Sequence, residues 1–189
     1  KDNVALILGD NFFYGQSLGL KLKESIKLKS GAKVLLHKVS KPELYGVAKI
    51  NKNKKIIKIV EKPKKFVSDY AITGLYFFDN KVIKLAKTLK PSKRGETEII
   101  DLLNKYKNEK KLKADFIGRG GAWLDTGSIK DFYNTSTFVS TIENRQGMKI
   151  ACIEEIAFYN KWIKRKEIQN SIKFYGNCDY SNYLKKIIG

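Results

Sequence analysis

Two aspartates, each placed directly after an apolar run, are the residues of this sequence best suited to chemistry. Asp10 follows the run Leu6–Gly9, and Asp125 follows the run Ala122–Leu124. In open α/β sheets, ligands and metals collect at the carboxyl ends of buried strands. Mg²⁺ prefers oxygen ligands and is usually held by one or two carboxylates together with substrate phosphates. We interpret the two aspartates as one Mg²⁺ site for phosphate chemistry; for either residue alone, capping of a turn or helix is the alternative.

Charged side chains that suit a sugar phosphate occur at two further places. Glu61 and Lys62 precede Pro63, which predicts an extended Lys62 whose ammonium projects from a strand end. A lysine is a compact cation for a phosphate monoester, and Glu61 suits sugar hydroxyls. Arg94 lies in a basic loop before a helix N-terminus, a natural anion site. A solvated strand end and a solvated loop are the alternatives.

Small and aromatic residues complete the candidate sugar pocket. Gly46 and Gly74 lie in β-prone segments, where a glycine admits a ligand close to the backbone or marks a simple bulge. Tyr76 and Trp123 are candidates to line the pocket, with core packing as the alternative. His37 is the only histidine, and we interpret it as structural.

The elements that must position these residues alternate between strand and helix. Residues 4–39 read as strand, helix, strand, which predicts a parallel pair with a right-handed crossover, and residues 47–60 predict a β-hairpin. The whole order predicts a mixed, mostly parallel α/β sheet flanked by helices. We expect a catalytic domain over residues 1–143 and a C-terminal helical region over residues 144–189. Strands are expected at 4–8, 34–39, 47–50, 56–60, 70–78 and 112–117, and helices at 16–29, 79–89, 96–106 and 128–144.

Composition limits the class of protein. The 189 residues are 42% hydrophobic, which suffices for a core, and no apolar run approaches the roughly 20 residues of a membrane span. The formal net charge is +19, but lysines spread over every segment indicate a solvated surface rather than specific nucleic-acid recognition. Cys152 and Cys178 fit no metal motif and predict reduced thiols in a cytoplasmic protein. The chain begins without Met, and we expect an N-terminal portion to be missing.

An ordered set of segments resembles the sugar-phosphate nucleotidyltransferases, in particular their thymidylyl branch. The resemblance spans nearly the whole chain. It rests on residues 8–15 (LGDNFFYG), 45–48 (YGVA), 60–63 (VEKP), 73–76 (TGLY), 94–101 (RGETEIID), 118–127 (GRGGAWLDTG), 145–152 (RQGMKIAC) and 154–157 (EEIA).

The resemblance implies a Rossmann-like fold and a Mg²⁺-dependent reaction. A thymidylyl group passes from dTTP to glucose 1-phosphate, giving dTDP-glucose and pyrophosphate, the first step toward dTDP-rhamnose and other deoxysugars. The resemblance gives metal binding to Asp10 and Asp125 and the sugar phosphate to Lys62 and Arg94. The glucose would be surrounded by Gly46, Glu61, Gly74, Tyr76 and Trp123.

The resemblance also implies a secondary nucleotide-sugar site for feedback inhibition and a homotetramer. The matching regulatory residues are Tyr14, Gly15, Arg119, Glu155 and Ile156. Tyr159 stands where an arginine is usual, which places regulation in doubt.

The family's glycine-rich phosphate loop does not occur in this chain. The chain by itself is therefore expected to bind dTTP poorly and to turn over negligibly. A sister enzyme that uses UTP, ATP or CTP and a non-catalytic nucleotide-sugar-binding module are the alternatives.

Overall fold

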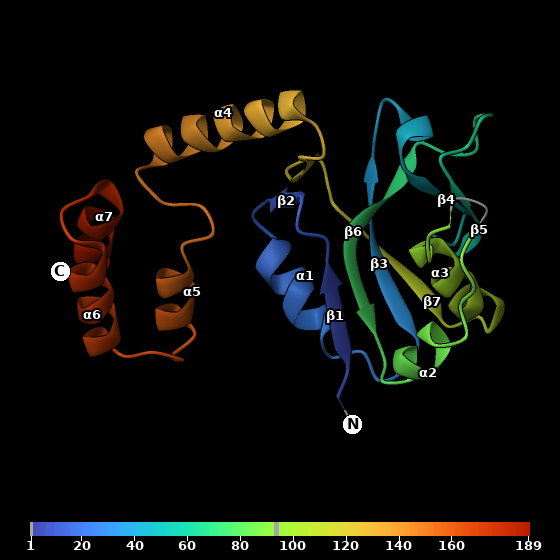
Figure 1. Cartoon of the computed structure of the whole chain (residues 1–189), viewed down its shortest axis with the longest axis horizontal. Helices are drawn as coiled ribbons and strands as arrows, with labels where there is room; N and C mark the ends of the chain where they lie inside the picture. The colour runs from blue at the N-terminus through green and yellow to red at the C-terminus, as the bar shows by residue number, and fades with distance from the viewer. Residues whose placement is uncertain (1, 93–94) are drawn as a thin grey trace. The chain divides into compact units, whose positions relative to one another are not determined.

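The computed structural model describes residues 2–92 and 95–189 (Figure 1). It divides into two compact units, one up to Asp131 and one from Phe132 to Gly189. Each unit is described separately. No helix within the described ranges is long and apolar enough to cross a bilayer.

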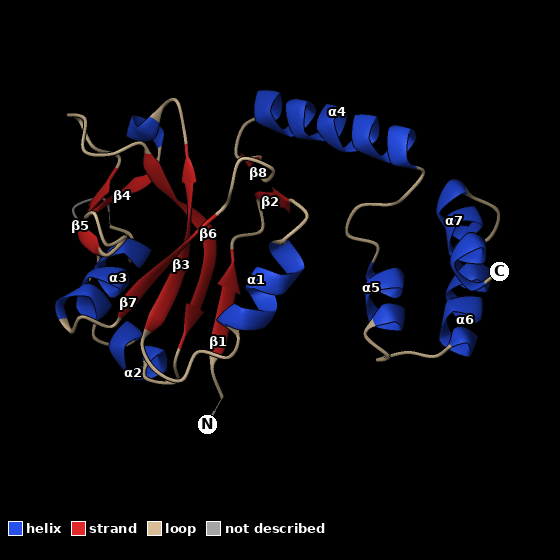
Figure 2. Cartoon of the chain, turned by 180° about the vertical axis from the view of Figure 1, so that it is seen from behind, coloured by secondary structure: helices blue, strands red, loops and turns tan. Residues whose placement is uncertain are grey.

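A mixed six-stranded sheet forms the first unit (Figure 2). The strand order is β5-β4-β6-β3-β7, and β1 pairs with β6 beside this path. The strands are β1 (Val4–Ile7), β3 (Ala32–Lys38), β4 (Gly46–Ile50), β5 (Ile56–Glu61), β6 (Tyr70–Phe78) and β7 (Leu112–Phe116).

The strand directions follow from the pairings. β3 and β7 pair in parallel, whereas β6 runs antiparallel to β1, β3 and β4, and β5 runs antiparallel to β4. Strands β1, β3, β4 and β7 therefore share one direction, and β5 and β6 run against them. The α/β class with a mixed sheet is confirmed, but the expectation that most strands pair in parallel is not met: among the described strands only β3 and β7 do, because β6 and β5 run against their neighbours.

The first strand differs from the prediction in its partner and in its burial. Residues 4–8 were expected to form a buried strand paired in parallel with residues 34–39, and this prediction is wrong. β6 lies between β1 and β3, and Ile7 of β1 is 57% exposed. The continuous apolar run is typical of a strand covered on both sides, but here the strand has one partner among the described residues and leaves an edge open to solvent.

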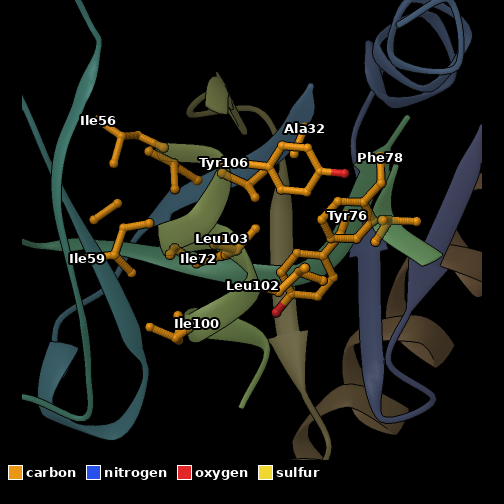
Figure 3. Close-up of a cluster of buried hydrophobic side chains, with 14 residues drawn as sticks. Ala32, Ile56, Ile59, Ile72, Tyr76, Phe78, Ile100, Leu102, Leu103 and Tyr106 are labelled. Carbon is orange, nitrogen blue, oxygen red and sulfur yellow. The ribbon is translucent and has the colours of Figure 1, made fainter. Parts of the chain in front are cut away.

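Helices cover both faces of the sheet because side chains alternate along each strand. On one face, Ile72, Tyr76 and Phe78 of β6 pack with Leu103 and Tyr106 (Figure 3). The last two belong to α3 (Ile99–Asn108), and α2 (Val82–Ala86) adds Val82 to the same core.

On the other face, residues of the opposite parity form a smaller core. Leu75 and Phe77 of β6 pack with Leu35 of β3 and with Leu22. Leu22 belongs to α1 (Leu18–Ser25), which is shorter than the helix expected over residues 16–29.

Four helices account for most of the second unit. They are α4 (Ile129–Gln146), which begins in the first unit, α5 (Ile153–Tyr159), α6 (Arg165–Tyr175) and α7 (Asp179–Ile188). Cys152, Ile168, Leu184 and Ile188 form the core of this unit. Both cysteines are free thiols, as expected.

Candidate functional site

A short two-stranded ladder brings the two aspartates together. β2 (Asn11–Tyr14) pairs antiparallel with β8 (Ala122–Asp125), and Asn11 lies opposite Asp125. Because the start of one antiparallel strand lies beside the end of the other, Asp10 and Asp125 become neighbours. Thr126 stabilises the end of the ladder at which Asp10 and Asp125 lie. Its N–H and its Oγ1–H both donate to the Asp10 carbonyl oxygen, at 2.8 and 2.9 Å.

The two carboxylates face one point of the backbone, Gly127. A Cβ placed on Gly127 would lie 3.0 Å from Asp125 Oδ1 and 3.7 Å from Asp10 Oδ2. The Gly127 N–H donates to Asp125 Oδ1 at 2.8 Å, and Asn11 Nδ2 donates to Asp10 Oδ1 at 2.7 Å. Each carboxylate thus keeps a second oxygen that accepts no hydrogen bond from the part of the chain that the structure describes.

The position of Asp10 differs from the expected one. Asp10 does not end a buried strand: β1 ends at Ile7, and Asp10 lies in the turn that leads into β2. Leu8 N–H donates to the Gly74 carbonyl oxygen at 2.9 Å, so this turn is tied to β6. The aspartates meet through the β2–β8 ladder rather than at a row of parallel strand ends.

Trp123 of β8 lies in an aromatic cluster next to the carboxylates. It is 8% exposed, and its ring centroid lies 5.0 Å from that of Tyr45 and 6.4 Å from that of His37. Burial lowers the pKa of His37, although a hydrogen bond to the Ile117 backbone acts in the opposite direction. Burial raises the pKa of Tyr45, and the negative charge of Asp125 adds to this. The cluster therefore favours the neutral forms of both side chains beside the carboxylates.

Gly46 and Glu61 lie opposite each other on β4 and β5. A Cβ on Gly46 would lie 2.8 Å from Glu61 Oε2 and 2.9 Å from Ile100 Cδ1. The absence of a side chain at position 46 therefore makes room for the Glu61 carboxylate. Tyr76 is 3% exposed and belongs to the core; burial, and then the charge of Glu61, raise its pKa to about 12.

Lys62 differs from the prediction in its backbone conformation. It was expected to be extended because Pro63 follows, but its φ is +38°, in the left-handed region. β5 ends at Glu61, and Lys62 N–H donates to the Tyr45 carbonyl oxygen at 3.1 Å, which holds the chain in this turn. A positive φ at a residue other than glycine is uncommon and costs free energy, and such residues cluster at functional sites. The Lys62 side chain is exposed, and Arg94 lies outside the described residues.

The regulatory residues divide between the two units. Tyr14 and Gly15 line a cavity of about 170 Å³ together with Lys21 of α1 and the three glycines of the loop 118–121. Arg119 belongs to that loop and is exposed. In the second unit, Glu155 accepts a hydrogen bond from the Tyr183 hydroxyl at 2.7 Å, and Ile156 is 45% exposed.

Asn11 is a residue of the site that the sequence reasoning missed. Its side-chain amide contacts Asp10, Trp123 and Gly74, three of the predicted site residues. A usable signal was present: a glycine inside a strand indicates close approach of another group, and the approaching group is the Asn11 amide.

The donor set suits a hard divalent cation. Two carboxylates with available oxygens match the preference of Mg²⁺ for a few protein oxygens plus water and phosphate. In the described ranges, no group of three or more His, Cys, Asp or Glu side chains is placed to hold a metal. The arrangement therefore suits a cation held jointly by protein and phosphate rather than a closed structural metal site.

Comparison with known proteins decides the family. The model of the family described as nucleotidyl transferase matches residues 1–142. The chain belongs to the nucleotidyl transferase family. Enzymes of this family generally use a divalent metal.

Individual relatives within this family are similar to the chain over nearly its whole length. This nucleotidyl transferase chain is 43% identical over 187 residues to a glucose-1-phosphate thymidylyltransferase of Neisseria meningitidis, covering 99% of the chain and 65% of that protein. It is 39% identical to the glucose-1-phosphate thymidylyltransferase of Mycobacterium tuberculosis, and this match also covers 99% of the chain and 65% of the relative. A Bacillus anthracis structure assigned as the same enzyme, solved with a sucrose, has a TM-score of 0.64 and 42% identity over 72% of this chain and 54% of that one. The chain thus spans about 65% of the length of the curated relatives.

Proposed function

We propose that this chain is the sugar-phosphate-binding part of a glucose-1-phosphate thymidylyltransferase. The observation that carries the proposal is the convergence of the Asp10 and Asp125 carboxylates at Gly127, beside Trp123, in a chain of this family. The relatives' names point to the same reaction.

The proposed reaction is a substitution at phosphorus. A phosphate oxygen of glucose 1-phosphate attacks the α-phosphorus of dTTP, the bond to the β-phosphate breaks, and pyrophosphate leaves. Such transfers depend mainly on positioning the reactants and on stabilising negative charge, so no protein nucleophile is needed.

Each candidate residue has a proposed role. Lys62 binds the phosphate of glucose 1-phosphate, and Arg94 assists it. Glu61 accepts hydrogen bonds from sugar hydroxyls, and Trp123 walls the sugar together with the backbone at Gly46 and Gly74. Tyr76 is buried in the core, so its proposed contribution is to support the Glu61 end of the pocket.

The proposed metal is Mg²⁺, held by Asp10 and Asp125. When bound, it neutralises charge on the phosphates. The chain's own residues orient the carboxylates: Asn11 and the Gly127 N–H each bind one carboxylate oxygen.

The proposal also covers the assembly of the protein, its location in the cell and an effector. We propose a cytoplasmic homotetramer that supplies dTDP-glucose for dTDP-rhamnose and deoxysugar synthesis. A dTDP-sugar effector is proposed for Tyr14, Gly15, Arg119, Glu155 and Ile156. Two of these residues line a cavity within the first unit, which supports an effector there.

Two alternatives are kept open. A sister enzyme that uses UTP, ATP or CTP would share the sugar-phosphate half, but the relatives' names favour dTTP. A non-catalytic nucleotide-sugar-binding module would not need two converging carboxylates, so the pair at Gly127 disfavours it.

Calorimetry with glucose 1-phosphate tests the sugar-phosphate half directly. We expect the chain to bind glucose 1-phosphate more tightly with Mg²⁺ than without, and to prefer it to glucose 6-phosphate. Lys62→Ala should weaken binding by about 10- to 100-fold, the loss of one charge-assisted contact. Lys64→Ala, which removes a neighbouring exposed lysine, is the matched control and should leave binding unchanged. Equal binding of both sugar phosphates would contradict the proposal.

A chimera tests the reaction itself. The part of the Neisseria meningitidis relative that this chain does not match would be joined to the chain, and dTDP-glucose formation would be followed by chromatography. We expect turnover from the chimera and negligible turnover from residues 1–189 alone. Turnover with UTP or ATP in preference to dTTP would favour the sister-enzyme alternative.

A further inference from the structure

Asn11 connects the two halves of the candidate site through one side-chain amide. Its Nδ2 donates to Asp10 Oδ1 at 2.7 Å, and its Oδ1 accepts from Trp123 Nε1 at 2.5 Å. We propose that Asn11 is a positioning residue that fixes the Asp10 carboxylate relative to the Trp123 indole, and so couples cation binding to sugar binding. This inference rests on the proposed function.

The contacts of Asn11 define which way its amide points. Oδ1 accepts a second hydrogen bond, from the Gly74 N–H at 3.1 Å. Both partners of Oδ1 are obligate donors, a backbone N–H and an indole N–H, so a flipped amide would place N–H groups against N–H groups. The amide therefore has one favourable orientation, and in that orientation its N–H group faces Asp10.

Gly74 is the residue that allows this arrangement. A Cβ at position 74 would lie 2.7 Å from both Cγ and Oδ1 of Asn11 and 2.8 Å from Nδ2. These separations are too short for any side chain, so the glycine in the middle of β6 leaves space for the amide. The close approach that a strand glycine indicates is thus made by Asn11 of the same chain.

The hydrogen bond from Asn11 also selects which Asp10 oxygen remains available. Oδ1 is engaged by Asn11, whereas Oδ2 is the oxygen that lies near Gly127, 3.7 Å from a Cβ placed there. Partners that orient a ligating carboxylate typically change metal affinity or activity by about 10- to 100-fold when they are removed. Asn11 is such a partner of the Asp10 carboxylate through its Nδ2. Through its Oδ1 it also holds the indole of Trp123, which is proposed to line the sugar site.

The test measures both ends in the same chain. Mn²⁺ affinity is measured by calorimetry as a probe of the cation site, and hydrogen exchange of the Trp123 indole proton is measured by NMR. Trp162→Phe assigns the two indole signals. The variants are Asn11→Leu, which removes all three hydrogen bonds, and Gly74→Ala, which displaces the amide and leaves Asp10 and Asn11 chemically intact. Asn53→Leu, in the exposed β4–β5 turn, is the matched control.

We expect both site variants to weaken Mn²⁺ binding by about 10- to 100-fold and to accelerate exchange of the Trp123 indole proton, with the control within about 2-fold of the parent chain. Asn11→Leu leaves buried donors unsatisfied, so Gly74→Ala decides the question if the first variant does not fold.

Three results overturn the inference. If the parent chain binds Mn²⁺ and both variants bind it equally well, or lose affinity with no change at the Trp123 indole, the positioning role fails and the proposed function stands. If the parent chain binds no Mn²⁺, the proposed cation site itself fails, and this inference fails with it.

Discussion

Substitution Gly46→Ala separates the packing role of this glycine from its role at the site. The added Cβ would lie 2.8 Å from Glu61 Oε2 and 2.9 Å from Ile100 Cδ1. Ile100 is 6% exposed and fixed in the core of the first unit, whereas Glu61 Oε2 is the end of a flexible side chain. The clash is therefore expected to displace the Glu61 carboxylate more than Ile100.

The expected magnitudes follow from these two contacts. Overpacking a well-filled position costs about 1–3 kcal/mol of unfolding free energy. If Glu61 accepts a hydrogen bond from the sugar, its displacement removes about 1.5–3 kcal/mol of binding free energy, or about 10- to 100-fold in affinity. The variant should thus be both less stable and a weaker binder of glucose 1-phosphate.

Urea unfolding and calorimetry measure these two effects separately. Gly19→Ala is the matched control. Apart from its chain neighbours and the nearby backbone of its own helix, no described atom lies within 4 Å of a Cβ at this exposed position of α1. In that helix the same substitution should stabilise by up to about 1 kcal/mol and leave binding unchanged. A Gly46→Ala chain that loses stability but binds glucose 1-phosphate normally would refute the placement of Glu61 at the sugar.

Three further predictions concern other parts of the molecule. Burial raises the pKa of Tyr76 from 10.0 to about 12, so the native state holds this proton more tightly than the unfolded state. The unfolding free energy should therefore fall as pH rises from about 10 to about 12, and urea unfolding of Tyr76→Phe should show a smaller fall; an identical pH profile would contradict this. Hydrogen bonding with the hydroxyl and the N–H of Ser181 lowers the pKa of the exposed Cys178 thiol, whereas Cys152 is buried. A thiol reagent should therefore label Cys178 first; equal rates in the native chain would count against the structure of α7. β1 pairs only with β6 among the described residues and exposes Ile7, so we expect the chain to self-associate through this edge and Ile7→Lys to reduce the association in sedimentation velocity. Association that Ile7→Lys leaves unchanged would contradict this.

The sequence predicted the elements with strong periodicity well. The β4–β5 hairpin, β6, β7, α3 and α4 lie where alternation and helical spacing predicted them, with ends shifted by a few residues. Their cores need only the local pattern of apolar residues, which the sequence contains.

The pairing of β1 was not predictable from its own residues. A continuous apolar run indicates burial on both sides but does not specify the neighbouring strand. β6, which lies about 70 residues further along the chain, separates β1 from β3 and leaves Ile7 exposed.

The candidate site was predictable in its residue types and not in its geometry. Asp10 and Asp125 were expected to meet, and they do, but through two four-residue strands too short for a clear alternation signal. Asn11 follows Asp10 directly and was missed because its role depends on Gly74 and Trp123, which are distant in sequence. Lys62 departs from the conformation favoured before proline because a hydrogen bond to Tyr45 holds it.

A Mn²⁺ titration of the chain and of its Asp10→Asn, Asp125→Asn and doubly substituted variants tests the central claim most directly. Because both carboxylates face Gly127, one ion should bind per chain, and either single substitution should abolish most of the affinity. The double variant should lose little more Mn²⁺ affinity than whichever single variant binds Mn²⁺ more weakly, since the same ion is lost in each. A single variant that binds Mn²⁺ as tightly as the parent chain, or losses that add as for two independent sites, would contradict a cation shared by Asp10 and Asp125.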